Sequence, residues 1–174
     1  NLMEFVDGYE IVTSNPCGEQ PLPKNFSCNL GSLNLSAFVR NPYTLEAYFD
    51  FEDFEKHIKI GIRALDGIID ENLNRHALKE QAKNSKNYRN IGLGVFGYAN
   101  MLFMLRIKYG SEEAKIFTDA LFNFMFRTAV IEDSILAEEL GAFPKFNKKV
   151  WDSTIIKKHF SPKELEDLRN CKLR

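Results

Sequence analysis

The sequence predicts an α+β protein that is mainly helical, and three features of its patterning lead to this prediction. Short β-branched or alternating apolar segments occur between residues 10 and 39, on either side of a turn rich in proline and glycine. From Asp50 onward, apolar residues recur every three or four positions, which is the spacing of an amphipathic helix. No internal repeat or low-complexity linker divides the chain. We therefore expect one unit over residues 1–174, with strands and a loop in residues 1–40 and helices in residues 50–170.

Two strands are expected in the first quarter of the chain. Glu10-Ile11-Val12-Thr13 is short and β-branched, so it predicts a strand that leads into the turn. Residues 27–39 alternate roughly between apolar and polar, and they predict a second strand. Within it, Gly31 indicates a bulge or the close approach of another element, because glycine otherwise weakens a strand.

The first predicted helix begins at Asp50, which is placed as its N-cap with Asp53 three residues on, close to a capping box. Its apolar positions share one face and comprise Phe51, Phe54, Ile58, Ile62, Leu65, Ile69 and Leu73. Residues 76–90 are polar and basic, so they predict a loop or a solvated helix end. Residues 91–105 are apolar nearly all round, a pattern typical of a buried helix.

Two further helices have clear end signals. Ser111 caps a long helix that Gly141 terminates at the C′ position. The residues expected to face inward from this helix are Ala114, Phe117, Leu121, Phe124, Thr128, Ile131 and Ile135. Ser161 begins the last helix, with Pro162 at N1 and Glu164 at N3, which is the pattern of a helix start.

The bulk composition argues against several classes of protein. At 44% hydrophobic and 27% charged, with a net charge of −1, the chain offers no electrostatic case for binding nucleic acid or an anionic membrane. No apolar run approaches the roughly 20 residues that span a bilayer. Three cysteines at irregular spacing do not form a secreted disulfide framework. We expect a cytoplasmic protein and, because the chain does not begin with methionine, a fragment of a longer one.

The turn carries the most informative residues. In Asn15-Pro16-Cys17-Gly18-Glu19, an amide, a thiol and a carboxylate occupy every second position. Pro16 biases Asn15 toward an extended backbone, in which side chains two residues apart point the same way. The three side chains would then converge on one pocket and offer a sulfur, a two-way hydrogen-bonding group and a base. Residue types alone leave open a turn that merely holds a buried structural cysteine.

Two longer blocks include the turn and follow it. The first is Ser14-Asn15-Pro16-Cys17-Gly18-Glu19-Gln20-Pro21-Leu22-Pro23, followed by Ser27-Cys28-Asn29-Leu30-Gly31-Ser32-Leu33-Asn34-Leu35. The second is Arg89-Asn90-Ile91-Gly92-Leu93-Gly94-Val95-Phe96-Gly97-Tyr98-Ala99. They resemble segments of the large, catalytic subunit of ribonucleotide reductase. This resemblance implies that the chain is part of a ten-stranded α/β barrel, with a radical cysteine on a loop inside it.

The resemblance also implies roles for four residues. Cys17 would carry a transient thiyl radical and abstract hydrogen from C3′ of the ribose, while Glu19 takes the proton of the 3′-hydroxyl as general base. Asn15 would bind the ribose hydroxyls and fix their orientation. Cys28 would be one half of the redox-active dithiol pair that supplies the reducing equivalents as the 2′-hydroxyl leaves as water. A buried structural thiol is the alternative for Cys28.

Partners and cofactors follow from the same resemblance. The substrate would be a ribonucleotide, most simply a ribonucleoside diphosphate, and the reductant a protein of the thioredoxin or glutaredoxin type. The radical would come from a metal-containing small subunit or from adenosylcobalamin, nucleotide effectors would regulate the enzyme, and the parent protein would be a homodimer. We expect no cofactor or metal on these 174 residues, which should be inactive by themselves.

Gly92-Leu93-Gly94-Val95-Phe96-Gly97 satisfies G-x-G-x-x-G without the context of a dinucleotide site. Such a site needs a strand directly before its first glycine. Residues 83–90 are too polar to form a buried strand, so we expect instead small residues in a helix that let a neighbouring element pack closely.

Two other classes of function remain open from the residues. A thiol-nucleophile enzyme would need His57, His76 or His159 within hydrogen-bond reach of Cys17. These histidines share no metal-ligand spacing with one another or with the cysteines. A non-catalytic helical interaction module predicts instead that Cys17→Ser has no effect in any assay.

Overall fold

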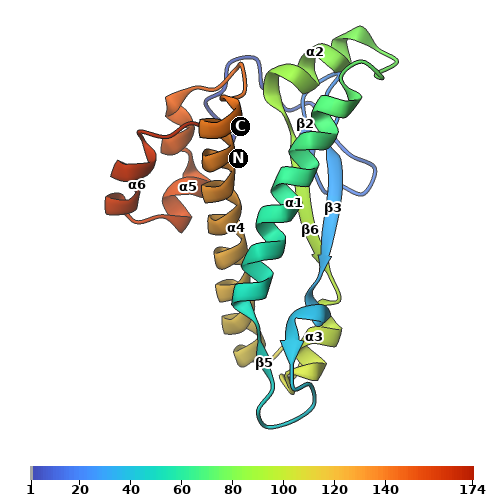
Figure 1. Ribbon diagram of the computed structural model, residues 1–174, viewed down its shortest axis with the longest axis vertical. Helices are drawn as coiled ribbons and strands as arrows, with labels where there is room; N and C mark the ends of the chain where they lie inside the picture. Colours follow the sequence, from blue (N-terminus) through green and yellow to red (C-terminus); the bar gives the residue numbers. More distant parts are fainter. Residues whose placement is uncertain (1) are drawn as a thin grey trace.

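A pair of parallel strands, with a long helix packed on one face, forms the centre of the fold (Figure 1). The computed structural model describes residues 2–174. In it, strand β3 (Asn29–Asn34) pairs with strand β6 (Ile91–Phe96) in parallel over six residues. Helix α1 (Phe51–Asn72) lies in the connection between them and packs on the sheet. Parallel strands need such a long connection, because a tight turn returns the chain antiparallel.

The longest helix, α4 (Glu112–Leu140), runs alongside α1 (Figure 1). Aromatic rings fill the main core around these two helices, namely Phe38, Phe49, Phe51, Phe54, Phe117 and Phe124. Several of them meet edge to face, with ring centroids 5.0 Å apart for Phe38 and Phe54 and 5.1 Å apart for Phe51 and Phe124. This geometry places the positive edge of one ring on the negative face of the next, which stabilises the pairs beyond the area they bury.

The ends of both long helices follow their sequence signals. Asp50 accepts a hydrogen bond from the Asp53 N–H at 2.9 Å, and the Ser111 hydroxyl accepts one from the Ala114 N–H at 3.2 Å. Each bond satisfies one of the N–H groups that the first turn of a helix leaves free. Gly141 ends α4 with a φ of +90°. The predicted boundaries of these helices are therefore confirmed.

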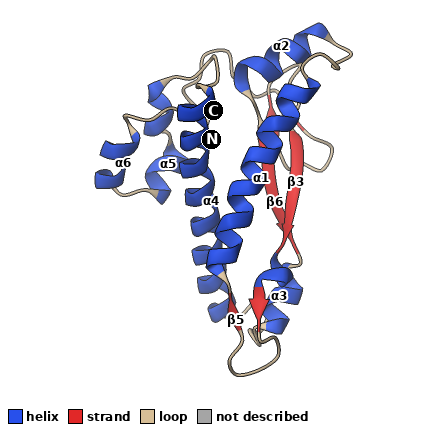
Figure 2. Ribbon diagram, viewed as in Figure 1, coloured by secondary structure: helices blue, strands red, loops and turns tan. Residues whose placement is uncertain are grey.

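The other elements are short (Figure 2). They are β1 (Thr13–Ser14), β2 (Pro21–Leu22), the 3-10 helix η1 (Leu35–Phe38), β4 (Val39–Arg40), β5 (Tyr48–Phe49), α2 (Lys79–Tyr88), α3 (Tyr98–Met104), the 3-10 helix η2 (Lys148–Asp152), α5 (Thr154–His159) and α6 (Pro162–Leu168). β1 pairs antiparallel with β2, and β4 with β5. The strand expected over residues 10–13 is thus reduced to a two-residue strand that begins at its last residue.

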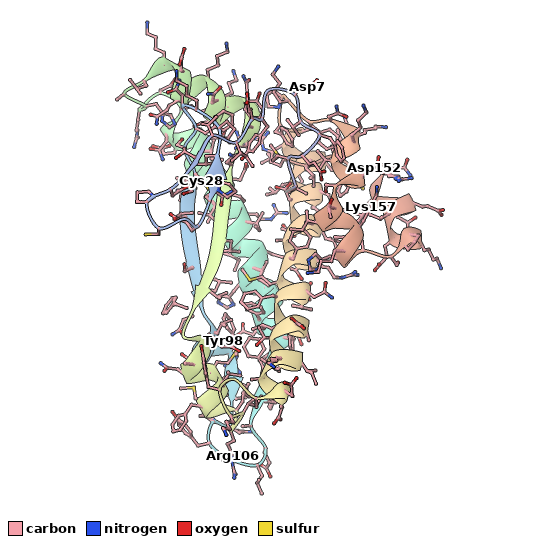
Figure 3. All side chains as sticks on the ribbon, turned by 180° about the vertical axis from the view of Figure 1, so that it is seen from behind. Asp7, Cys28, Tyr98, Arg106, Asp152 and Lys157 are labelled. Carbon is pink, nitrogen blue, oxygen red and sulfur yellow. The ribbon has the colours of Figure 1, made fainter. Side chains whose placement is uncertain are left out.

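A second apolar core lies at the C-terminal end of the chain, where η2, α5 and α6 pack on α4. Val150, Trp151 and Ile156 are fully buried in it. Helix α6 begins with the predicted capping box, in which Ser161 and Glu164 each bond the other's backbone N–H. Figure 3 shows these short helices on the opposite side of α4 from the sheet.

Residues 91–105 do not form one buried helix, so that prediction is wrong. They form β6 and, after Gly97, helix α3. A short apolar run has the same appearance in a buried strand and a buried helix. Gly92 and Gly94 favour the strand, because each glycine disfavours a helix by about 1 kcal/mol. Pairing with β3 then satisfies the hydrogen bonds of the backbone. The glycines of the G-x-G-x-x-G pattern therefore lie in a strand, and α2 rather than a strand precedes them.

The inward face predicted for α4 is confirmed as far as Thr128, which is buried, but it is wrong at its last two positions. Ile131 and Ile135 are 40% and 38% exposed. In the second half of the helix Leu136 faces the main core, whereas Val130 belongs to the second core. Because α4 is packed on two sides here, a single stripe of apolar spacing does not describe it. Glu132 is buried instead and pairs with the guanidinium of an arginine on α1.

Candidate active site

The loop between β1 and β2 holds Asn15, Cys17 and Glu19 in a tight turn. The Gly18 N–H donates to the Asn15 carbonyl at 2.9 Å, and the Asn15 N–H donates to the Gln20 carbonyl at 3.1 Å. Gly18 has a φ of +75°, a left-handed conformation that glycine adopts readily. The extended backbone predicted for these residues is therefore wrong, because the chain reverses within the motif. Cys17 and Glu19 are exposed, and Asn15 is half-buried.

Asn15 contributes an unused hydrogen-bond acceptor. Its Oδ1 atom is buried and has no hydrogen-bond partner among residues 2–174. Such atoms are rare in native structures, because a buried polar atom without a partner costs free energy. Oδ1 is therefore available to a donor, such as a hydroxyl group brought by a ligand.

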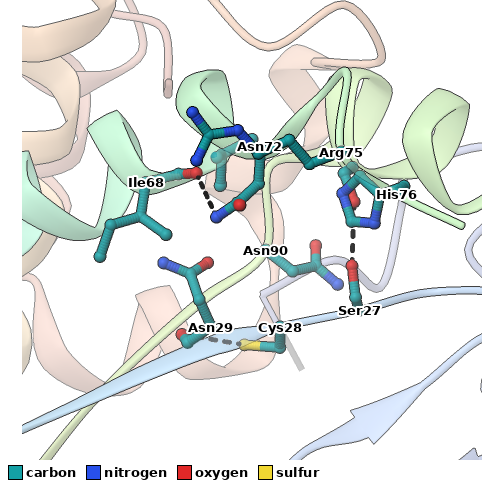
Figure 4. Close-up of a pocket in the computed structure, with 10 residues that line it drawn as sticks. Ser27, Cys28, Asn29, Ile68, Asn72, Arg75, His76 and Asn90 are labelled. Carbon is teal, nitrogen blue, oxygen red and sulfur yellow. Dashed lines mark hydrogen bonds between the residues drawn. The ribbon is translucent and has the colours of Figure 1, made fainter.

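Cys28 immediately precedes β3 and is half-buried. It lines a cavity of about 210 Å³ between the start of the sheet and the end of α1 (Figure 4). Arg75, His76 and Asn90 contribute polar groups to the same cavity. The Cys28 thiol itself makes only a weak contact, with Sγ 3.7 Å from the carbonyl oxygen of Asn29.

Helix α1 covers one face of the β3–β6 pair. A Cβ atom on Gly31 of β3 would lie 3.5 Å from the side chain of Leu65, and one on Gly61 of α1 would lie 3.0 Å from Leu93 of β6. Helix α1 thus packs against Gly31 at an ordinary van der Waals distance, whereas its approach to the sheet at Gly61 is tight. Since successive residues of a strand point to opposite faces, the neighbours of Gly31 and Leu93 point away from α1.

Gly92 is one of these neighbours, and it marks where Cys28 meets the end of the Asn15–Glu19 loop. A Cβ atom on Gly92 would lie 3.5 Å from Cys28 Sγ and 3.7 Å from the Oε1 atom of Gln20, the residue that follows the loop. It would lie only 2.4 Å from the Cδ2 atom of Leu30, the partner of Gly92 across the sheet. The structure therefore brings Cys28 and the base of the loop together on the face that α1 leaves uncovered.

The Cys28 thiol is held in its protonated form. Burial, and then the charge of the Glu19 carboxylate, raise the pKa of Cys28 to about 11. Because the thiolate is the reactive form of cysteine, Cys28 is a weak nucleophile at neutral pH. The Glu19 carboxylate therefore acts on Cys28 through its charge.

Sequence reasoning missed Tyr9 and Asn90, which form a hydrogen-bonded pair beside Cys28. The Asn90 Nδ2 atom donates to the Tyr9 hydroxyl oxygen at 2.9 Å. Asn90 directly precedes β6 and lines the Cys28 cavity. Its presence in the second block that resembles the reductases was the available signal for it, whereas no spacing pointed to Tyr9.

Arg89 fixes the backbone at the start of β6, and the sequence also gave no role for it. Its side chain is 4% exposed, and its Nε and Nη1 atoms donate to Asp66 at 2.7 Å and to Asp70 at 2.6 Å. The residue has a φ of +47°, which is costly without glycine. The two carboxylates of α1 therefore hold Arg89, and with it the first residues of β6, in one position.

The histidines do not form a catalytic pair with Cys17. His57 bonds the carbonyl of Asp53, and His159 bonds Asn123. Across residues 2–174, no hydrogen bond links any histidine to Cys17, so the pairing that a thiol-nucleophile enzyme requires is not formed. The same residues contain no group of three or more His, Cys, Asp or Glu side chains placed to hold a metal ion. None of the described helices is long and apolar enough to cross a membrane.

Comparison with known proteins identifies the family. The model of the ribonucleotide reductase barrel domain matches residues 1–172, so the chain belongs to the ribonucleotide reductase family. It is 37% identical over 148 residues to the vitamin B12-dependent ribonucleoside-diphosphate reductase of Thermoplasma acidophilum, covering 85% of this chain and 18% of that protein. It is 38% identical over 136 residues to the vitamin B12-dependent ribonucleoside-diphosphate reductase of Mycobacterium tuberculosis, covering 78% of this chain and 19% of that protein.

A relative of another kind is the ribonucleoside-diphosphate reductase subunit alpha of Chlamydia pneumoniae. It is 36% identical over 125 residues, which cover 72% of this chain and 11% of that protein. The resemblance inferred from the two sequence blocks is therefore confirmed. The chain spans less than a fifth of the length of each of these curated relatives.

Proposed function

We propose that the protein carrying this sequence reduces ribonucleotides, most simply ribonucleoside diphosphates, to deoxyribonucleotides for DNA synthesis by a thiyl-radical mechanism. The observation that carries this proposal is the meeting of Cys28 with the Cys17 loop at Gly92, within a chain of the ribonucleotide reductase family. A thiol pair and a radical thiol must both reach one ribose, so the segments that bear them must lie together. The structure supports this for Cys28 and the loop.

In the proposed reaction, the Cys17 sulfur radical takes the hydrogen atom from C3′ and becomes a thiol. Glu19 accepts the proton of the 3′-hydroxyl, which requires direct hydrogen-bond reach. The 2′-hydroxyl then leaves as water, and Cys28 with a second thiol supplies two electrons as the pair becomes a disulfide. The hydrogen finally returns from Cys17 to C3′, which restores the sulfur radical. The net change is one ribonucleotide and two thiols converted to one deoxyribonucleotide, one disulfide and water.

The positions of the proposed residues support this assignment. Cys17 and Glu19 are exposed on a turn, where a substrate has access to them. The unpaired Oδ1 atom of Asn15 supports a role in accepting a hydrogen bond from a ribose hydroxyl. The raised pKa of Cys28 supports a thiol that keeps its proton until it is used. Its dithiol partner would lie outside residues 2–174, since neither Cys17 nor Cys171 is proposed for that role.

We also propose that residues 2–174 form part of a ten-stranded α/β barrel. β3, α1 and β6 constitute a parallel strand–helix–strand unit, the building block of such barrels. Among the described residues β6 pairs only with β3, which leaves its other edge free for a further strand. A largely apolar cavity of about 530 Å³ between β6 and α4 adjoins this edge. A strand from another part of the protein would fill it and satisfy the free backbone groups.

The radical source belongs to the same proposal. The relatives include proteins named vitamin B12-dependent and others named subunit alpha, so adenosylcobalamin and a metal-containing small subunit both fit. Either source would supply the one-electron oxidation that converts the Cys17 thiol to a thiyl radical. We further propose a dithiol reductant of the thioredoxin or glutaredoxin type, nucleotide effectors, a homodimeric parent and a cytoplasmic setting.

Formation of deoxyribonucleotide by the whole protein, supplied with its radical source and a dithiol, tests the proposal. Cys17→Ser should abolish product formation while the circular dichroism spectrum stays unchanged. Cys171→Ser is the matched control, because Cys171 lies in the second core, and it should retain activity. Equal activity of wild type and Cys17→Ser would refute the role of the loop. If neither wild type nor Cys17→Ser formed deoxyribonucleotide, the result would favour a non-catalytic interaction module.

A further inference from the structure

Tyr9 and Asn90 form a pair near Cys28 that the proposed reaction does not use. Asn90 shares the Cys28 cavity and bonds Tyr9, and the charge of Cys28 contributes, after burial, to a raised pKa of the Tyr9 hydroxyl. The parallel register of the sheet begins with Asn29 opposite Ile91. Cys28 and Asn90 are the residues directly before this pair, so they sit side by side at the same end of the two strands. Both line the cavity of about 210 Å³, where Figure 4 draws them close together.

The hydrogen bond between Asn90 and Tyr9 leaves one proton unused. Asn90 Nδ2 donates and the Tyr9 hydroxyl oxygen accepts, at 2.9 Å. The hydroxyl of tyrosine can also donate, and among residues 2–174 its proton has no acceptor. The bond from Asn90 therefore fixes the hydroxyl oxygen and leaves its proton free for a further acceptor.

Both residues of this pair are held firmly. The ring of Tyr9 packs on Phe26, with centroids 5.3 Å apart, and on Tyr88, with centroids 5.8 Å apart. Asn90 follows Arg89, whose buried guanidinium is bound by two carboxylates of α1. A donor group that is positioned in advance loses little conformational entropy when it binds its acceptor.

Cys28 is a group that needs such a donor. Whenever a disulfide of Cys28 is broken by a thiolate of a dithiol reductant, the S–S bond opens and Cys28 receives the electron pair as a thiolate. That thiolate then takes a proton from water. The charged groups near it are Glu19, which opposes the negative charge, and Arg75, which is already paired with Glu71. The imidazole of His76 lines the same cavity. A neutral hydroxyl donor would stabilise the thiolate without adding a fixed charge.

We propose that Tyr9 and Asn90 are positioning residues for Cys28, with Asn90 orienting the Tyr9 hydroxyl so that it donates a hydrogen bond to the Cys28 thiolate. The proposal rests on the redox role of Cys28 in the proposed function. Tyr9 and Asn90 come from segments that neither carry a cysteine nor belong to the turn, so they extend the site beyond its four predicted residues. The proposed hydrogen bond from Tyr9 forms only when Cys28 is a thiolate. The protonated thiol of the resting protein therefore makes a different contact.

The test is the pH dependence of Cys28 alkylation by iodoacetamide in the whole protein, followed by mass spectrometry of the Cys28 peptide. Tyr9→Phe keeps the ring and removes the hydroxyl. It should raise the apparent pKa of Cys28 by about one unit, which lowers the alkylation rate below that pKa about tenfold. Asn90→Ala should act in the same direction, and Tyr9→Phe with Asn90→Ala should add little to either change, because both remove the same interaction.

Tyr88→Phe is the matched control. It removes a hydroxyl from the same aromatic cluster, but that hydroxyl already donates to the carbonyl of Asp7. It should leave the alkylation profile unchanged. An unchanged profile in Tyr9→Phe, or an equal change in Tyr88→Phe, would overturn the proposal. Alkylation needs no turnover, so this result is independent of whether Cys17→Ser abolishes deoxyribonucleotide formation, and either proposal can fail without the other.

Discussion

The Cys28 sulfur lies 3.5 Å from the point where a side chain on Gly92 would begin, although the two residues are far apart in the sequence. The contact depends on the parallel pairing of β3 with β6, which sets Leu30 opposite Gly92. The absence of a side chain on Gly92 therefore leaves the space in which Cys28 and Gln20 approach each other. This relationship joins the proposed dithiol to the proposed radical loop.

Gly92→Ala in the whole protein should lower deoxyribonucleotide formation. The added methyl group would displace the end of Leu30 and occupy the space beside Cys28 and Gln20, and overpacking of this kind costs about 1 to 3 kcal/mol of stability. The displacement of Cys28 from its position should reduce the rate severalfold. The measurement is the steady-state rate with a dithiol reductant.

Gly94→Ala provides the control for this change. A Cβ atom on Gly94 would meet Ser32 Oγ at an ordinary 3.5 Å and nothing closer, so activity should be retained. Leu30→Ala, combined with Gly92→Ala, should recover part of the loss because it removes the closest contact. Equal losses in Gly92→Ala and Gly94→Ala would show that the space above Gly92 has no special role.

Glu19→Gln should make Cys28 more reactive toward alkylation. The Glu19 charge disfavours the thiolate, so its removal lowers the pKa of Cys28 from about 11 and increases the thiolate fraction between about pH 8 and that pKa. The rate of iodoacetamide modification at pH 9 measures this. Glu10→Gln, an exposed carboxylate before β1, should have no effect, and a slower reaction in Glu19→Gln would contradict the proposed electrostatic contact.

Arg89→Met should destabilise the fold far more than Arg75→Met. Arg89 and Asp66 have side chains only 4% and 6% exposed. Without Arg89, the buried Asp66 carboxylate keeps only the Arg174 guanidinium, at 3.2 Å, so the cost should approach the roughly 3 to 5 kcal/mol of a broken buried pair. Arg75 pairs with Glu71 on the surface, where such pairs contribute about 0 to 1 kcal/mol. Urea denaturation of the whole protein measures both, and comparable losses would contradict the role assigned to Arg89.

Protonation of Glu164 should weaken α6 in acid. Its bonds to Arg127 and Ser161 lower its pKa to about 2, so the stabilisation is fully present above the ordinary value of 4.5 and is lost as the pH falls toward 2. Thermal unfolding of wild type and Glu164→Gln at pH 7 and pH 3 tests this. The difference between the two proteins should shrink at the lower pH, and a constant difference would contradict the assignment.

Much of the helical structure was predictable because its signals are local. Asp50, Ser111 and Ser161 each accept a hydrogen bond from the backbone N–H three residues ahead, so their roles follow from the residues that immediately surround them. The strand at residues 91–96 was not predictable in this way, because its partner is β3, more than fifty residues earlier. Likewise, the exposure of Ile131 depends on a second core that no helical spacing reveals.

The residues of the candidate site fall into the same two groups, those with local sequence signals and those that join the site through long-range contacts. Cys17, Glu19, Asn15 and Cys28 lie within fourteen residues and form a segment that resembles a known family, so the sequence alone assigned them roles. Gly92, Asn90 and Tyr9 join the site through the register of the sheet and one long-range hydrogen bond. Asn90 and Gly92 belong to the second block that resembles the reductases, but their contacts with Cys28 and with Tyr9 depend on the folded chain and follow from no spacing in the sequence.

Hydrogen transfer from C3′ is the central claim, and competition between isotopic substrates tests it most directly. The whole protein would be given an equal mixture of ribonucleotide carrying protium and ribonucleotide carrying deuterium at C3′. Abstraction of that hydrogen by Cys17 predicts that the first deoxyribonucleotide formed is enriched in the protium form, and that Cys17→Ser forms none. Product with the same isotope ratio as the substrate, formed equally by Cys17→Ser, would contradict the account.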